Sequence, residues 1–192
     1  MHTYQPTTTL LRTWPQIGLR WMPTFLGFPI GGYIANLIVG RIDAVAPAVL
    51  GGAITGAILG LAQWLGMRRT GPPPTRWVVA SAAGLAVGLA AGAAAVGYDT
   101  DTGALAVQGA VCGAAIGIGQ AAVLHRHLGR VAWVWPALLA GLWALGWTTT
   151  ASAGIDVESQ YTVFGSSGAL VVTAATSVLA IALASRPERG AR

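Results

Sequence analysis

Two glutamines, Gln63 and Gln120, are of interest because each lies inside an apolar stretch and because 57 residues separate them. A neutral amide both donates and accepts hydrogen bonds, so within a membrane it can bind a neighbouring helix. The same amide could line a polar path for a solute. Ser177 follows Gln120 by a further 57 residues and offers a smaller polar group. These three residues are candidates for an interhelical hydrogen bond or a polar path.

Three aspartates recur with nearly the same period. Asp43, Asp99 and Asp156 are separated by 56 and 57 residues, and each lies in a short polar link. The three carboxylates could form an acidic ring that concentrates cations at an outer mouth. Alternatively, they are ordinary turn and helix N-cap residues, a role that aspartate favours. Both interpretations stay open from the sequence.

The sequence does not group residues for metal or nucleophilic chemistry. The single cysteine, Cys112, excludes an intrachain disulfide and a zinc site built on several cysteines. His125 and His127 form no metal site without further ligands. No glycine-rich stretch ends in the Gly-Lys-Ser or Gly-Lys-Thr of a phosphate-binding loop. We therefore expect no metal, no cofactor and no enzymatic activity.

The composition indicates that these polar residues belong to a membrane protein. Hydrophobic residues make up 54% of the 192-residue chain, and charged residues make up only 9%. An average soluble domain is about 25% charged. So little charge could not cover the surface of a soluble protein, which argues against a soluble enzyme and against a nucleic-acid-binding protein.

Six apolar stretches are long enough to cross a bilayer, whose hydrocarbon core requires about 20 residues per helix. The first is the weakest because Pro23 and Pro29 interrupt it. Residues 1–20 lack the apolar core of a signal peptide and form either a short interfacial helix or a partly ordered cytoplasmic arm. Residues 187–192 form a cytoplasmic tail. The six predicted spans are Trp21–Gly40, Ala44–Met67, Trp77–Gly97, Ala104–Leu124, Val131–Thr150 and Tyr161–Ala184.

The charged residues predict how the spans are oriented. All eleven Lys and Arg residues are arginines, and ten of them fall in the N-terminal arm, the second and fourth links and the tail. Five of the six acidic residues fall in the other links. Because cytoplasmic links are enriched in basic residues, we expect a multi-pass protein of a bacterial-type plasma (inner) membrane with both termini in the cytoplasm. The positive charge also predicts contact with anionic lipids of the inner leaflet, and no nucleic-acid partner.

The spacing of several residues predicts three copies of one helical hairpin of about 57 residues. Trp21, Trp77 and Trp135 begin the first helix of each copy, with spacings of 56 and 58. The copies cover residues 21–70, 77–127 and a diverged 131–186. Each copy crosses twice, so the copies share one orientation about an axis along the membrane normal. The predicted fold is a single all-α membrane domain of six transmembrane helices with pseudo-threefold symmetry.

Glycines recur at every fourth position on three of the predicted helices. Lipid supplies no hydrophobic drive between helices, so close backbone contact across small residues must hold a membrane bundle together. We therefore predict that these glycine stripes are packing surfaces, with pore lining and homo-oligomer contact as the other interpretations. The stripes comprise Gly52, Gly56 and Gly60; Gly84, Gly88 and Gly92; and Gly109, Gly113 and Gly117.

One run resembles a group of known sequences. From Gly56 to Arg69 the chain has the pattern Gly-x-x-x-Gly-x-x-Gln-Trp-Leu followed by Arg-Arg, which is similar to glycine-rich repeat membrane proteins of unassigned function found in bacteria. The resemblance covers the first two copies, although Ala121 and Ala122 follow Gln120 in the second. It implies a multi-span membrane protein without implying an activity.

Three functions are compatible with these patterns. The first is a non-enzymatic integral membrane protein, a scaffold or accessory subunit that binds a partner membrane protein or a second copy of itself. The second is a small channel or facilitator for a neutral or cationic solute along the pseudo-threefold axis. The third is pigment or lipid binding between spans, near Trp143 and Trp147. The direction of the Gln63 and Gln120 side chains distinguishes the first two.

Overall fold

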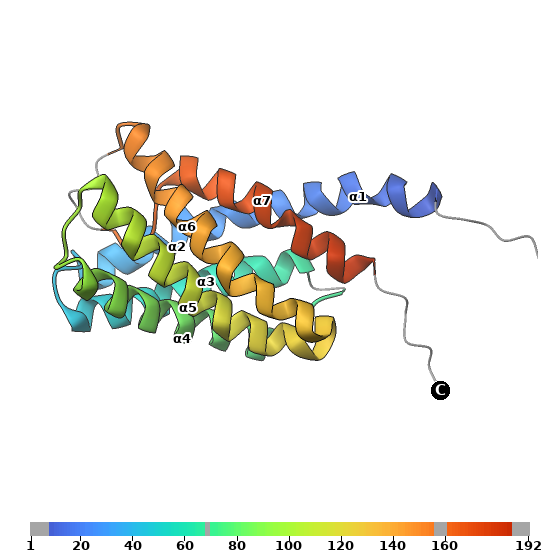
Figure 1. The fold of residues 1–192 in the computed structure, drawn as a ribbon, viewed down its shortest axis with the longest axis horizontal. Coiled ribbons are helices and arrows are strands. Elements are labelled where there is room, and N and C mark those ends of the chain that lie inside the picture. The colour runs from blue at the N-terminus through green and yellow to red at the C-terminus, as the bar shows by residue number, and fades with distance from the viewer. Residues whose placement is uncertain (1–7, 68–69, 156–160, 186–192) are drawn as a thin grey trace, which may run out of the picture.

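A computed structural model of the chain describes residues 8–67, 70–155 and 161–185 (Figure 1). In these residues the regular structure is helical throughout, without any strand, which confirms the predicted all-α class. The elements in chain order are α1 (Thr8–Trp21), the 3-10 helix η1 (Met22–Leu26), α2 (Gly27–Val39), α3 (Val45–Met67), α4 (Pro74–Ala95), α5 (Thr102–Leu128), the 3-10 helix η2 (Gly129–Val134), α6 (Trp135–Ser152) and α7 (Ser166–Ala184).

Consecutive long helices run in opposite directions, so the links alternate between two ends of the molecule (Figure 1). The arginine end is the end at which α4 begins and α5 ends, and it carries Arg20, Arg76, Arg126 and Arg130. The aspartate end is the opposite one, and it carries Asp43, Asp99 and Asp101.

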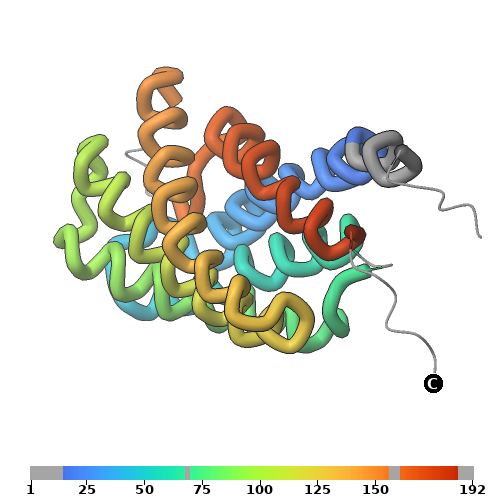
Figure 2. Tube along the Cα trace, turned by 45° about the vertical axis from the view of Figure 1, so that its right-hand side comes forward, coloured from blue at the N-terminus to red at the C-terminus, as the bar shows by residue number. Residues whose placement is uncertain are grey.

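The helices form a closed ring around one interior. α3 packs against α2 and α4, α5 packs against α4 and α6, and α7 packs against α6. α7 also contacts α1, η1 and α2, so the first and last helices meet and close the ring (Figure 2). The helices that carry Gln63, Gln120 and Ser177 therefore surround the same interior.

Five segments of the described chain are long and apolar enough to cross a membrane: Pro15–Val39, Val45–Met67, Pro74–Ala95, Thr102–Ser152 and Ser166–Ala184. The 51-residue segment Thr102–Ser152 contains both α5 and α6, which η2 separates and which pack side by side. Large apolar side chains also cover the outside of the bundle, since Leu37 is 66% exposed and Val79 and Val87 are each 65% exposed. An apolar exterior of this kind matches a lipid environment.

Several of the predicted span boundaries differ from the helix boundaries in the structure. The span expected at residues 21–40 begins with the 3-10 turn η1 around Pro23, because proline cannot donate to a regular helical ladder. The span expected from Val131 begins at Trp135, because Gly129, with φ of +61°, ends α5 and residues 129–134 form η2. The span expected from Tyr161 begins only at Ser166.

Residues 161–165, which we term the plug segment, are not helical and enter the aspartate end of the bundle. Thr162, Val163 and Phe164 of this segment are all buried. The hydroxyls of Thr162 and Thr55 lie 2.7 Å apart, and the ring of Phe164 stacks on that of Phe28 at 5.0 Å. Irregular backbone is tolerated inside a membrane-spanning bundle when protein surrounds it. The plug segment thus fills the bundle at the aspartate end.

Candidate functional site

The two predicted glutamines meet inside the bundle. Gln63 of α3 and Gln120 of α5 are both buried, and Gln120 Nε2 donates to Gln63 Oε1 at 3.1 Å. The same nitrogen donates to Ser81 Oγ of α4 at 2.9 Å. This amide pair therefore connects α3 to α5 and also binds α4, which lies between them.

Two tryptophans donate hydrogen bonds to the oxygens of the amide pair. Trp77 Nε1 donates to Gln63 Oε1 at 3.2 Å, and Trp135 Nε1 donates to Gln120 Oε1 at 2.8 Å. An indole nitrogen can only donate, so each tryptophan requires an amide oxygen at its contact. A single chain of hydrogen bonds therefore runs from Trp135 on α6 to Gln120 on α5 and then to Gln63 on α3. Gln63 also accepts a hydrogen bond from Trp77 of α4.

The third tryptophan makes a related contact with α7. Trp21 Nε1 donates to Thr176 Oγ1 at 3.2 Å and to the Thr173 carbonyl oxygen at 3.1 Å. Ser177, which the spacing had selected, is half-buried, and its side chain has no hydrogen bond within the described part of the chain. Spacing therefore identified the correct turn of α7 but missed Thr176 as the acceptor. The signal that could have found it is the pair of threonines three residues apart in an apolar helix.

The three indole contacts follow one order around the ring. Trp77 at the start of α4 binds α3, and Trp135 at the start of α6 binds α5. Trp21 at the end of α1 binds α7. Each of these buried tryptophans thus joins its helix to the preceding helix in the ring, a donor role that the sequence spacing alone did not reveal.

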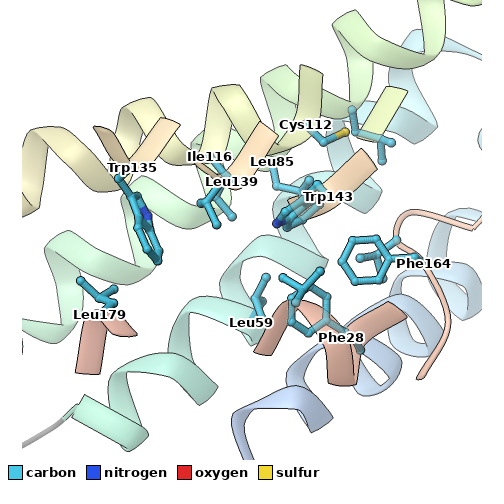
Figure 3. Close-up of a cluster of buried hydrophobic side chains, with 14 of the residues drawn as sticks. Phe28, Leu59, Leu85, Cys112, Ile116, Trp135, Leu139, Trp143, Phe164 and Leu179 are labelled. Carbon is cyan, nitrogen blue, oxygen red and sulfur yellow. The ribbon is translucent and has the colours of Figure 1, made fainter. Parts of the chain in front are cut away.

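Apolar side chains fill the interior between the amide pair and the aspartate end (Figure 3). Leu59 lies one helical turn from Gln63, and it is fully buried, as is Leu85. Closer to the aspartate end, the ring of Trp143 meets that of Phe164 edge-on at 5.2 Å. The side chains drawn in this core include Ile116, Leu139 and Phe28 (Figure 3). The amide pair therefore adjoins a packed apolar core.

The glycine stripes face neighbouring helices of the same chain. A Cβ on Gly56 would lie 2.5 Å from the Ser81 carbonyl oxygen, and a Cβ on Gly84 would lie 2.6 Å from Ile116 Cα. The stripe on α3 faces α4, the stripe on α4 faces α5, and the stripe on α5 faces α6. Side chains larger than hydrogen would force these helices apart, so the stripes set how closely the backbones approach.

The acidic candidates occupy the links at the aspartate end. Asp99 accepts hydrogen bonds from the backbone nitrogens of Thr100 and Asp101 at 2.6 and 3.1 Å. Asp101 caps α5 by accepting from Ala104 N at 2.8 Å. Asp43 is exposed in the link before α3, and Asp156 lies outside the described residues. The acidic ring stays a prediction, while Asp99 and Asp101 have local turn and cap roles.

Among the described residues, the structure places no group of three or more histidine, cysteine, aspartate or glutamate side chains that could hold a metal ion. Comparisons of the chain with protein-family models, curated proteins and solved structures find no match. The resemblance to glycine-rich bacterial repeat proteins therefore stays a prediction, and the functional argument rests on the geometry of the bundle.

Proposed function

We propose that this chain is a non-enzymatic scaffold or accessory subunit of a bacterial-type inner membrane, where it binds a partner membrane protein or a second copy of itself. The observation that carries this proposal is the hydrogen bonding of the amide pair. The Oε1 atom of Gln63 accepts two hydrogen bonds, and the side chain of Gln120 makes three. Their partners are all side chains of neighbouring helices.

A residue that lines a solute path must exchange hydrogen bonds with water or with the solute. Gln120 is fully buried, and both its nitrogen and its oxygen bond to protein groups. Side chains such as Leu59 and Leu85 fill the adjoining interior. These features favour a structural role of the two glutamines over a channel or facilitator.

The same proposal includes six crossings arranged as three related hairpins. Two observations support it: α5 and α6 pack side by side, and each of the three tryptophans donates to the preceding helix in the ring. The acceptors Gln63, Gln120 and Thr176 are spaced by 57 and 56 residues. Because a repeat places equivalent residues in equivalent contacts, this regularity favours a pseudo-threefold bundle held by glycine stripes.

The orientation belongs to the proposal as well. Arginines dominate one end of the described bundle and aspartates dominate the other, with Arg41 as the exception. The positive-inside rule then favours a cytoplasmic location of the arginine end and of both termini.

A groove near Trp147 favours the pigment- or lipid-binding alternative. It has a volume of about 350 Å³, and its lining includes Phe28, Tyr33, Trp147 and Phe164. A ligand held there would copurify with the protein. Preparations free of any chromophore and of tightly held lipid would eliminate this alternative.

A test of the closed interior uses single cysteines in a Cys112→Ala background. We expect Leu59→Cys and Ile116→Cys to resist a small cationic methanethiosulfonate reagent, because both positions are buried in the apolar core. Asp101→Cys, at an exposed position, is the reactive control. Rapid modification of both interior cysteines in the folded protein would overturn the proposal in favour of a water-filled path.

A further inference from the structure

The arginine end of the bundle has a basic pocket on its outer surface, between the start of α4 and the end of α5. The pocket has a volume of about 270 Å³. Its lining residues are Pro73, Arg76, Ala122, Val123, Arg126 and His127. Neither the amide pair nor the three tryptophans contribute to it, so the pocket is separate from the candidate site described above.

The positive charge of this pocket has no nearby carboxylate in the described part of the chain. Arg76 and Arg126 are exposed, and the described acidic residues Asp43, Asp99 and Asp101 all lie at the aspartate end. Arg76 also lies in the first turn of α4, where unpaired backbone N–H groups favour an anion. Two arginines therefore line one small volume with no described counter-charge.

A buried imidazole nitrogen adds an unpaired polar atom to the same pocket. His127 Nδ1 is buried and has no hydrogen-bond partner among the described residues. His127 thus adds a third polar side chain to the lining of the pocket.

The pocket is polar at one end and apolar at the other. Arg126 and His127 lie one helical turn beyond Ala122 and Val123 on the same face of α5. Along α5, Ala122 and Val123 lie nearer the middle of the bundle, and Arg126 and His127 lie nearer its arginine end. A phospholipid has the same order of groups, with an acyl chain that leads to a charged phosphate.

We propose that this pocket binds the phosphate of an anionic phospholipid. Arg76 and Arg126 bind the phosphate oxygens, since a guanidinium matches phosphate geometry with paired donors. His127 contributes a further polar contact, and the first part of an acyl chain lies along Ala122 and Val123. The site goes beyond the scaffold function and does not depend on it, because a lipid can bind here whatever the bundle assembles with.

The test measures lipid binding to the purified full-length chain in a neutral detergent by native mass spectrometry. Dioleoylphosphatidylglycerol is titrated against dioleoylphosphatidylcholine, for the wild type and for the Arg76→Gln/Arg126→Gln variant. Arg130→Gln is the matched control, because Arg130 is an exposed arginine at the same end that does not line the pocket. We expect the paired variant to weaken phosphatidylglycerol binding by about tenfold or more, and the control to leave it unchanged.

Three results would each overturn the site. Equal binding of phosphatidylcholine would show that the anionic headgroup is not recognised. Equal weakening by Arg130→Gln would show a diffuse attraction to the whole arginine end. Displacement of the lipid by inorganic phosphate at equal concentration would show that the ligand is free phosphate and that the apolar half of the pocket contributes nothing. None of these results bears on whether the amide pair is structural.

Discussion

Gln120 shows how a polar residue can stabilise a bundle that is otherwise apolar. Its buried side chain bonds to Gln63, Ser81 and Trp135, which belong to three other helices. Interhelical hydrogen bonds in membranes contribute about 0.6 kcal/mol on average, and up to about 1.7 kcal/mol. Three such bonds from one side chain therefore make Gln120 a central residue for the stability of the bundle.

Replacing Gln120 should destabilise the protein more than replacing a comparable glutamine. Gln120→Leu leaves the Trp135 indole and the Ser81 hydroxyl without their partner, so we expect a loss of about 1–3 kcal/mol in unfolding free energy. Gln108→Leu is the control, because Gln108 is buried on the same helix and has no side-chain hydrogen bond within the described part of the chain. The measurement is denaturant unfolding in detergent, followed by tryptophan fluorescence.

Equal losses for the two variants would mean that the hydrogen bonds of Gln120 add nothing beyond burial. A smaller loss for Gln120→Leu than for Gln108→Leu would contradict the structural role outright.

The sequence predicted the amide pair as candidates but could not predict all their partners. A spacing of 57 residues places Gln63 and Gln120 at the same depth, and the two do meet. Depth does not determine rotation, however, since adjacent residues on a helix point about 100° apart at 3.6 residues per turn. This is why the spacing selected Ser177 when its neighbour Thr176 is the residue that binds Trp21.

At the scale of the helix, glycines decide how closely neighbours pack. A Cβ on Gly113 would collide with the carbonyl of Leu139 on α6, whereas a Cβ on Gly141 of α6 would meet nothing within 4 Å. Both are helical glycines, so their conformational preferences are the same. The difference between the two positions isolates the contribution of close packing.

Alanine substitutions at these two glycines should therefore have opposite effects. Gly113→Ala should destabilise the bundle, because α5 and α6 must move apart. Gly141→Ala should be neutral or should stabilise by up to about 1 kcal/mol, the gain in helix propensity. Thermal unfolding in detergent measures both. If Gly113→Ala proved as stable as Gly141→Ala, the stripe on α5 would not be a packing surface.

The apolar stretches were predictable as elements, while several of their boundaries were not. Hydropathy reports that a segment is surrounded by apolar groups and does not report whether it is helical. The predicted span from Tyr161 includes the plug segment, yet that segment is not helical, and Val163 and Phe164 are buried within the protein. Likewise, η2 replaces the start of a predicted span where Gly129 adopts a positive φ.

At the scale of the whole molecule, contacts between the first and last helices close the ring. The hydrogen bond from Trp21 to Thr176 joins residues 155 positions apart, and α1 packs along α7. The predicted pseudo-threefold arrangement implies that the first hairpin adjoins the last, but spacing within the sequence gave no means of predicting that Trp21 and Thr176 make the contact. With the ring closed, the amide pair and the apolar core become the interior of one bundle.

The central claim is that Gln63 and Gln120 hold this bundle together and do not conduct a solute. The most direct measurement is flux of small neutral and cationic solutes into liposomes that contain purified wild-type protein or the Gln63→Leu/Gln120→Leu variant. Because the amides bond to protein groups beside a packed core, we predict that wild-type protein adds no flux over empty liposomes. Solute flux through wild-type liposomes that the paired variant abolishes would contradict the account.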